Sequence, residues 1–301
     1  MSKWSRSLTA AGVTDPGARR DYEEQRRLVA RFRPASYLAV RLLLPRPVLP
    51  HVVAMTAVMH HGDNLLDTGP RPHREAAWAD WERRVRAGLA AGTSDDALVR
   101  ALVSTVAARP RLGRAVEEYL ATARAELEFA GFATEDDYQS YVDAYSLPAF
   151  MLVAELLGPD GDDDGRYRAA CRMFIDGSQR LDFVNDLAED LRDGRLGIAA
   201  SALEKFSVPT DDLVAGRSPA GLPELLDDQL GLARAALLAS RRLTGLVPAG
   251  SRRLVRALIE IELLTADAAR ERGPALLRGA AGPPKAGAAR ALVRALLGSG
   301  R

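Results

Sequence analysis

Two groups of aspartates in this sequence have a spacing that could do chemistry. Asp63 and Asp67 are four residues apart, and the same interval separates Asp182, Asp186 and Asp190. Residues four apart lie on one face of a helix, so each group can direct two carboxylates at one point. Without nearby cysteines or spaced histidine ligands, these oxygen ligands suit Mg²⁺, which keeps waters and bridges to phosphate. The spacing therefore predicts bound Mg²⁺ ions that in turn bind a diphosphate.

Apolar neighbours indicate where these aspartates lie. Leu65 and Leu66 adjoin the first pair, and Phe183 and Leu187 adjoin the second group. Helices with such residues pack against a core, which would place the carboxylates in a cavity whose apolar wall shelters a carbocation from water. Arg195, just beyond the second group, could hold the diphosphate with its planar guanidinium. The alternative is that the aspartates and the arginine lie on solvated helix faces.

Composition limits the class of protein. The 301 residues include 41 Lys+Arg and 40 Asp+Glu, a net charge of +1, which argues against a nucleic-acid-binding protein. Cys171 is the single cysteine, so an internal disulfide is excluded and a reducing, cytoplasmic compartment is expected. No stretch approaches the roughly 18 apolar residues of a membrane span. We therefore expect peripheral membrane contact at most.

The elements that must position these residues are predicted to be helices. Apolar residues recur three and four apart, as at Val52, Met55, Val58 and Met59, and no clean alternating stretch predicts a strand. We expect one all-α domain over residues 1–301, with Pro148 bending or breaking one helix. The expected helices span 15–32, 48–67, 73–91, 95–108, 111–131, 134–157, 166–193, 222–244, 250–271 and 286–297, and residues 162–164 are expected in a solvated loop.

Several of these segments together resemble the squalene/phytoene synthase family. Residues 36–39 (S-Y-L-A) with 43–45 (L-L-P) are similar to its opening segment, and Asp63 with Asp67 matches its first aspartate motif. The most specific match is to its second signature, and it is carried by Gly177, Gln179, Asp182, Phe183, Asp186, Asp190 and Arg195. The resemblance covers about residues 30–270 and leaves a tail over about 280–301. It implies the α-helical isoprenoid synthase fold, a central cavity between facing aspartate pairs, Mg²⁺ and prenyl diphosphate substrates.

The resemblance also implies roles for individual residues. The implied metal ligands are Asp63, Asp67, Asp186 and Asp190, and the residues that would orient metal and diphosphate are Ser36, Gln179, Asp182 and Arg195. His60, Asp182 and Tyr145 are the candidates for contact with the reacting groups. Relatives commonly carry arginine at the position of His60, so either His60 or His61 could contact the diphosphate or take a proton from the acceptor. The alternative for both histidines is packing or solvent exposure.

Departures from the family pattern lie on the side of the acceptor. The first signature of the family has valine, alanine and two glycines at four positions that are occupied here by Tyr145, Ser146, Leu147 and Phe150. In the second signature, Asn185 replaces an arginine or glutamate. Beyond Arg195, the segment Gly197-Ile198-Ala199 replaces an aromatic-x-proline segment. Bulkier side chains along the first of these helices would reshape the pocket for a second long prenyl chain. The metal half of the site would then be intact and the acceptor half rebuilt. The alternative is drift between distant relatives that keep one reaction.

The function we expect is that of a Mg²⁺-dependent prenyltransferase, which ionises an allylic prenyl diphosphate and transfers the prenyl group to a small-molecule acceptor. We favour an aromatic acceptor of specialised metabolism, such as a carbazole, because of the bulky segment at Tyr145. The alternatives within this class are head-to-head condensation of two prenyl diphosphates, giving a phytoene-, presqualene- or squalene-type product, and a terpene cyclase. A non-catalytic relative that binds an isoprenoid or a partner protein would have degraded aspartate motifs, and both groups are intact here.

Overall fold

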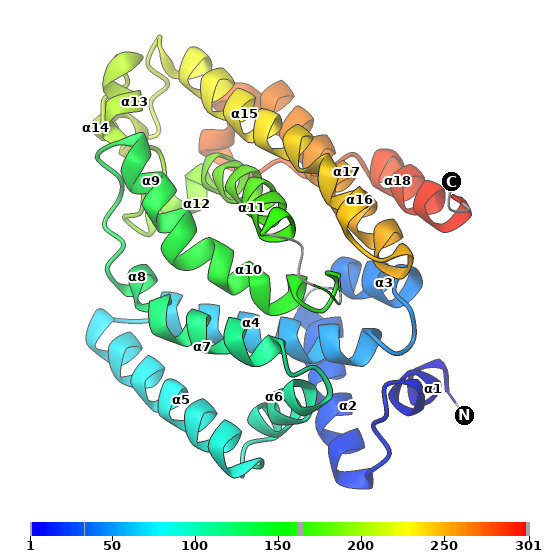
Figure 1. Ribbon diagram of the computed structural model, residues 1–301. Helices are drawn as coiled ribbons and strands as arrows, with labels where there is room; N and C mark the ends of the chain where they lie inside the picture. The colour runs from blue at the N-terminus through cyan, green and yellow to red at the C-terminus, as the bar shows by residue number, and fades with distance from the viewer. Residues whose placement is uncertain (1, 33, 160, 162–164, 299–301) are drawn as a thin grey trace. The chain divides into compact units, whose positions relative to one another are not determined.

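The computed structural model describes residues 2–32, 34–159, 161 and 165–298, and over these residues it consists of helices and turns without a strand (Figure 1). The prediction of an all-α fold is confirmed. The α-helices are α1 (Lys3–Ala10), α2 (Pro16–Phe32), α3 (Pro34–Leu43), α4 (Leu49–Asp67), α5 (Arg71–Ala91), α6 (Ala97–Ala108), α7 (Leu112–Thr122), α8 (Arg124–Leu127), α9 (Glu135–Tyr141), α10 (Leu147–Ala154), α11 (Arg166–Asn185), α12 (Leu187–Arg192), α13 (Ala200–Lys205), α14 (Thr210–Val214), α15 (Leu222–Ala239), α16 (Leu243–Leu246), α17 (Ala249–Arg272) and α18 (Lys285–Leu297). A π-helical segment, η1 (Val142–Ser146), and two 3₁₀ segments, η2 (Ser240–Arg242) and η3 (Gly273–Arg278), complete the set.

The chain forms two compact units, each made of segments that are discontinuous in the sequence. Unit 1 comprises Met1–Glu128, Pro148–Asp160 and Val247–Leu254. Unit 2 comprises Phe129–Leu147, Gly161–Leu246 and Val255–Arg301. The chain therefore alternates between the units, and the single domain over 1–301 stays a prediction.

Helix α4 is the central helix of unit 1. It packs against α2, α5 and α6, and each residue of 52–55 is at most 1% exposed. A helix that is apolar on all sides belongs in a core, and the first half of α4 meets that description. Trp78 and Trp81 of α5 are fully buried, as expected for packing residues. The other end of α4, with Asp63 and Asp67, emerges from this core.

Helices α11 and α15 make the most extensive helix–helix contact of the described residues, and they form the centre of unit 2. Buried residues recur along α11 at helical spacing, as at Tyr167, Cys171, Phe174 and Leu181. Cys171, the single cysteine, is buried in this helix. This packing fixes the helix that carries the second signature.

Two long helices expected from the sequence are interrupted. Segment 134–157 divides into α9, η1 and α10, with Pro148 as the second residue of α10. Since proline has no N–H to donate to the carbonyl four residues before it, a regular helix is interrupted here. The preceding turn is wider, because the N–H of Leu147 bonds to the carbonyl of Val142, five residues back. The predicted break at Pro148 is confirmed.

Segment 166–193 divides into α11 and α12 at Asp186, whose φ of −92° and ψ of 13° leave the helical range. The expectation that the second aspartate group lies in one continuous helix is therefore wrong. Segment 111–131 likewise divides into α7 and α8, and α3 is a helix that the sequence patterns did not predict.

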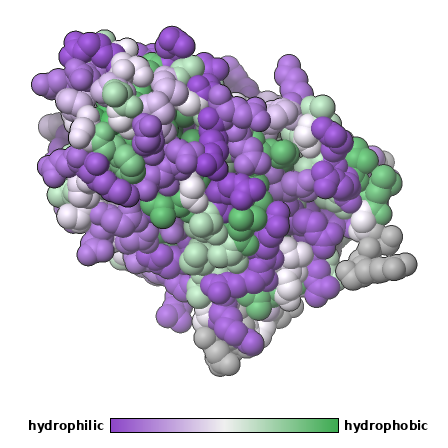
Figure 2. Space-filling view, turned by 90° about the horizontal axis from the view of Figure 1, so that it is seen from above, coloured by the Kyte–Doolittle hydropathy of each residue, from purple (hydrophilic) through white to green (hydrophobic). Residues whose placement is uncertain are grey.

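The remaining expectations concern the surface and the tail. The tail helix expected at 286–297 is confirmed as α18, whereas residues 162–164 and 299–301 lie outside the described residues. Among the described helices, none has the length and apolar character that crossing a membrane requires. Figure 2 shows a face on which hydrophilic residues predominate, with hydrophobic residues in small groups between them.

Candidate active site

The first aspartate pair lies at the carboxyl-terminal end of α4. Asp67 is the last residue of the helix and Asp63 lies about one turn earlier; Asp63 is half-buried and Asp67 exposed. The carbonyl end of a helix carries partial negative charge, so two carboxylates there repel each other and the helix end. A bound cation would relieve both repulsions. Carboxylate oxygens on one helix face are a donor set that fits Mg²⁺.

The two adjacent histidines have different surroundings. His60 Nδ1 lies 3.8 Å from Asp63 Oδ2, and its side chain is 25% exposed. His61 packs edge-on against Trp81 with ring centroids 4.5 Å apart, and burial lowers the pKa of its imidazole. His60 is therefore the histidine that accompanies the first aspartate pair, and His61 belongs to the core of unit 1.

Tyr119 of α7 is a neighbour of this pair that the sequence patterns did not indicate. Burial raises the pKa of its phenol well above its ordinary value, and the charges of Asp63 and Asp67 raise it further. The hydroxyl has no hydrogen-bond partner among the described residues. Because it lies some 50 residues further along the chain than the aspartates, no local spacing marks it. It adds a polar group beneath the first pair.

The second aspartate group spans the junction of α11 and α12. Asp182 is exposed on α11, Asp186 joins the two helices, and Asp190 lies half-buried on α12. Burial raises the pKa of Asp190 to about 6; Arg195 opposes this shift and Asp186 adds to it. A carboxylate held next to another in a partly desolvated place is stabilised by a cation. This group therefore also fits a divalent metal ion.

A turn at the end of α12 brings Arg195 back to Asp190. Gly194 adopts a left-handed conformation with φ of +70°. Its N–H donates to the carbonyl of Leu191, and the N–H of Arg195 donates to the carbonyl of Asp190. These two bonds define a Schellman motif, which glycine favours because it has no Cβ. The Arg195 guanidinium lies 4.9 Å from the ring centre of Phe129. The interval of five residues between Asp190 and Arg195 is thus the one that the outer hydrogen bond of a Schellman motif spans.

Gln179 is held by a residue that departs from the family pattern. Ser146 of η1 donates from Oγ to Gln179 Oε1 at 2.9 Å. With its oxygen engaged by Ser146, the Gln179 amide keeps its N–H donors for an anionic ligand. Tyr145, the preceding residue, is buried with its ring 5.5 Å from that of Tyr141. The segment that contains Tyr145 and Ser146 therefore orients Gln179 in addition to filling space.

Asn185, a second departure, has a structural role. Its side chain exchanges two hydrogen bonds with the backbone of Ala281, Nδ2 to the carbonyl at 3.0 Å and the amide to Oδ1 at 2.8 Å. These bonds fasten the segment after η3 to the last residue of α11.

The third departure is explained by packing against Phe183. A Cβ at position 197 would overlap the Phe183 ring, so the ring takes up the room that a side chain there would need. Phe183 stacks on Phe129 at 5.8 Å with 9° between the ring planes, and Phe132 and Tyr141 also contact it. Gly197 and the Phe183 ring are therefore matched to each other.

A buried arginine ties α11 to α9 and α15. Arg180 is 5% exposed; it donates to both carboxylate oxygens of Glu135 and to Gln229 Oε1 at 3.0 Å. Its guanidinium also lies 4.1 Å from the ring centre of Tyr138. Multiple partners offset the cost of burying the charge and fix the orientation of α11. Signature residues on both sides of Arg180 are thereby held in place.

The predicted site residues fall into two sets, one in each unit. His60, Asp63 and Asp67 lie together at the end of α4, and Ser36 is exposed on α3 of the same unit. The set in unit 2 is Tyr145, Gln179, Asp182, Asp186, Asp190 and Arg195. Within the described ranges, no three His, Cys, Asp or Glu side chains form a metal-binding cluster by themselves. Mg²⁺ is usually bound through one or two carboxylates, with waters and phosphates completing its shell.

Comparison with known proteins identifies the family. The family model for squalene/phytoene synthase matches residues 30–287. The chain is 30% identical over 223 residues to the bifunctional protein CrtB/UppS of Streptomyces coelicolor and 25% identical over 207 residues to the 15-cis-phytoene synthase of Synechococcus elongatus. These matches cover 74% and 65% of this chain, but only 39% and 66% of those two relatives.

Solved structures give the same fold. Squalene synthase HpnC from Alicyclobacillus acidocaldarius superposes with a TM-score of 0.75 at 25% identity, over 88% of this chain and 98% of that one. A dehydrosqualene synthase superposes with a TM-score of 0.79 at 17% identity, over 92% and 96%. The chain thus has the α-helical isoprenoid synthase fold. The chain belongs to the squalene/phytoene synthase family.

Proposed function

We propose that this chain is a Mg²⁺-dependent prenyltransferase that ionises an allylic prenyl diphosphate. The observation that carries the proposal is the pair Asp186 and Asp190, where burial raises the pKa of Asp190 to about 6 and Arg195 approaches on the same turn. Two carboxylates with a guanidinium beside them suit a metal ion that bridges to a phosphate group. Enzymes of this family transfer prenyl groups from prenyl diphosphates, which supports the proposal.

The chain's own residues then have distinct tasks. Asp63 and Asp67 in unit 1 and Asp186 and Asp190 in unit 2 are the proposed metal ligands. Arg195 binds the diphosphate with its guanidinium, and Gln179 donates to it from the amide that Ser146 orients. When bound, Mg²⁺ would neutralise the charge that develops on the departing diphosphate. Aromatic rings such as Phe129 and Phe183 stabilise positive charge nearby.

A second prenyl diphosphate is the acceptor that the relatives favour. Their names include phytoene synthase, squalene synthase and dehydrosqualene synthase, so head-to-head condensation is the product-forming step we propose first. An aromatic acceptor is the second candidate. The observation that favours it is the buried Tyr145 beside Tyr141, where the family signature has a smaller residue.

The test is an assay of the purified chain with Mg²⁺ and allylic diphosphates of increasing length, with and without a panel of aromatic compounds. Diphosphate release and products are measured together. A coupled hydrocarbon formed without any aromatic compound supports condensation, whereas release that requires an aromatic compound supports the second candidate. Cyclic products from one substrate alone would contradict both.

Two variants of α12 make the assay specific. Asp190→Asn should lower diphosphate release by about 100-fold, because the metal loses a negatively charged ligand. Glu189→Gln removes an exposed carboxylate one residue away and should retain activity. Equal activity of the wild type with Mg²⁺ and with a chelator would overturn the proposal.

A further inference from the structure

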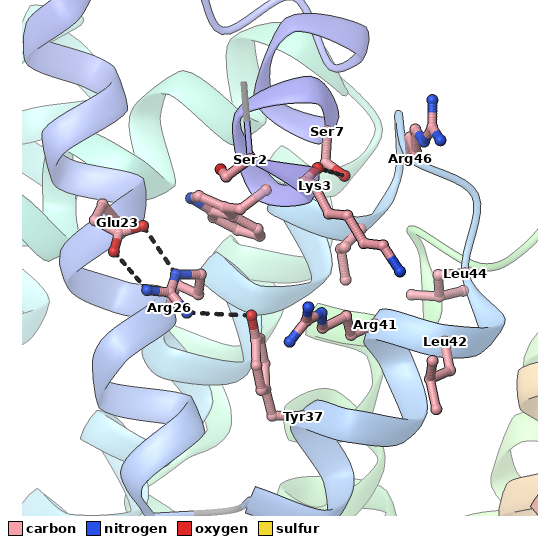
Figure 3. Close-up of a pocket in the computed structure, with 12 residues that line it drawn as sticks. Ser2, Lys3, Ser7, Glu23, Arg26, Tyr37, Arg41, Leu42, Leu44 and Arg46 are labelled. Atoms are coloured by element: carbon pink, nitrogen blue, oxygen red, sulfur yellow. Dashed lines mark hydrogen bonds and ion pairs between the residues drawn. The ribbon is translucent and has the colours of Figure 1, made fainter.

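A cavity of about 860 Å³ lies in unit 1, beside the first residue of α4 and not at the end of that helix that carries Asp63 and Asp67 (Figure 3). Its walls come from α1, α2 and α3 and from the first residue of α4, Leu49. Asp63 lies 14 residues further along α4, which is about 21 Å at 1.5 Å per residue. The volume is in the range of pockets that hold small organic ligands, roughly 300–1,000 Å³. The lining of the cavity therefore does not include the first aspartate pair, and the cavity is large enough for more than an inorganic ion.

The cavity is strongly positive. Its lining includes the cations Lys3, Arg26, Arg41 and Arg46 and one carboxylate, that of Glu23. Glu23 is already engaged by Arg26, whose Nε lies 2.8 Å from Glu23 Oε2 and whose second terminal nitrogen reaches Oε1. The internal ion pair leaves an excess of three positive charges around the cavity.

Three cations carry that excess. The side chains of Lys3, Arg41 and Arg46 form no hydrogen bond or ion pair with any residue that the structure describes. Figure 3 shows Lys3 extending from α1 toward α3 and the Arg41 guanidinium pointing toward the Tyr37 hydroxyl, with Arg46 at the edge. Arg26 donates to that hydroxyl from the other side at 3.4 Å. Lys3, Arg26 and Arg41 thus bring donors from three helices to one space, and Arg46 lies in the turn after α3 at its edge.

The start of α1 adds to the positive potential. Ser2, the N-cap residue, and Lys3, the first helical residue, both line the cavity. The first backbone N–H groups of a helix carry partial positive charge and favour anions. Here this helix end reinforces the unpaired side-chain cations.

Apolar residues occupy the rest of the lining. They include Trp4, Leu42, Leu44 and Leu49. Leu42 is 42% exposed and stands one turn from Leu38, which is 47% exposed on the same face of α3. The cavity lining therefore has a cationic part and an apolar part, which match a ligand with an anionic head and an apolar tail.

We propose that this cavity binds the phosphate group of an amphiphilic phosphate ester. Arginine guanidinium groups match phosphate oxygens in geometry, and three uncompensated cations favour a group with more than one negative charge. The ester is either a soluble molecule or a phospholipid at a membrane surface. In both cases the head lies between Lys3 and Arg41, with Arg46 at the edge of the cavity, and the apolar part extends over Leu42.

The test measures binding without Mg²⁺ and in the presence of a chelator, so that metal-dependent binding at the aspartates is excluded. In the first arm, decyl phosphate at concentrations where it is monomeric is titrated calorimetrically. In the second arm, the protein is sedimented with phosphatidylcholine vesicles that contain or lack phosphatidic acid. Each arm compares the wild type with Arg41→Gln, Arg46→Gln and the control Arg114→Gln. Arg114 is an exposed arginine of α7 outside the cavity.

We expect Arg41→Gln and Arg46→Gln each to weaken binding by about tenfold or more, and Arg114→Gln to leave it within about twofold. Binding should also weaken as salt rises, because the contacts are charged. Loss confined to decyl phosphate identifies a soluble ester, and loss confined to acidic vesicles identifies a lipid. The proposal is overturned if neither probe binds, or if the Arg114 variant loses as much binding as the cavity variants. Circular dichroism spectra and melting temperatures of the variants exclude misfolding as the cause.

Discussion

The backbone N–H of Arg195 donates to the carbonyl of Asp190 at 2.7 Å. A proposed diphosphate ligand and a proposed metal ligand are therefore joined through the backbone, five residues apart in the sequence. The glycine between them makes this possible, since Gly194 has a φ of +70°. Any change to the helix ending should move the arginine relative to the aspartate.

The first prediction concerns this turn. Gly194→Ala should cost about 1 kcal/mol of stability, because a Cβ is strained at positive φ. It should also raise the KM for the prenyl diphosphate several-fold, because Arg195 is displaced. Steady-state kinetics and chemical denaturation measure the two effects. Gly216→Ala is the matched control, since Gly216 has φ of +68° at the same kind of ending after α14. A similar KM change in both variants would contradict the prediction.

The second prediction concerns the match between Gly197 and Phe183. Gly197→Ala should destabilise the protein by about 1–3 kcal/mol, because the added methyl group overlaps the Phe183 ring. In a Phe183→Leu background the same change should cost less than about 1 kcal/mol, because the ring is gone. Urea denaturation of the four proteins measures the coupling. Equal costs in both backgrounds would show that the ring does not limit position 197.

The third prediction concerns the buried arginine of α11. Arg180→Leu should destabilise the protein by about 1–3 kcal/mol, because it leaves the buried Gln229 Oε1 without its donor and removes the ion pair with Glu135. The control is Arg172→Leu, which breaks a more exposed pair with Asp143 at 2.6 Å on the same helix. That change should cost about 1 kcal/mol or less. Thermal and urea unfolding give both values, and similar losses would contradict a special role for Arg180.

The fourth prediction is a pH dependence of stability at Glu262 on α17. Burial raises the pKa of this carboxyl from 4.5 to about 7, although a hydrogen bond from Ser178 opposes the shift. A raised folded-state pKa means that folding takes up a proton, so this group's contribution to stability falls as pH rises from about 4.5 to about 7. Glu262→Gln should therefore be more stable than the wild type at pH 8 by roughly 2 kcal/mol, and the gain should shrink toward pH 5.

Unfolding curves at pH 5, 6, 7 and 8 check this trend. Glu260→Gln is the control, because Glu260 lies two residues away in the same helix and pairs with Arg294 at 2.7 Å on the surface. That variant should be no more stable than the wild type at any of these values. A pH-independent gain for Glu262→Gln would be evidence against burial as the cause.

The all-α fold and the grouping of aspartates could be predicted because both depend on local spacing. Apolar residues three and four apart specify which helix faces are buried, and Pro148 marks a break in advance. The division at Asp186 could not be predicted, since no glycine or proline accompanies it. Helix α3 could have been found from Pro34 at its first position and from the buried Tyr37, Ala39 and Leu43.

Interactions between residues that are distant in the sequence could not be predicted, for a physical reason. The hydrogen bond between Asn185 and Ala281 spans 96 residues, and the charges of the first aspartates raise the pKa of Tyr119 on another helix. Such contacts and charge effects depend on how helices pack, and single-sequence periodicity carries no information about which helices become neighbours. The residues that orient the predicted ligands were therefore harder to identify than the ligands themselves.

The alternation of the chain between units 1 and 2 has a consequence for synthesis. Unit 1 includes Val247–Leu254, so it lacks one of its segments until most of the polypeptide has been made. A fragment that stops at Glu128 contains both aspartates of the first pair but exposes apolar surface that 148–160 and 247–254 would otherwise cover. Incomplete chains of this kind are prone to aggregate. A fragment that holds every segment of unit 1 must extend to Leu254 and so contains most of unit 2 as well, which links the assembly of unit 1 to the synthesis of most of the chain.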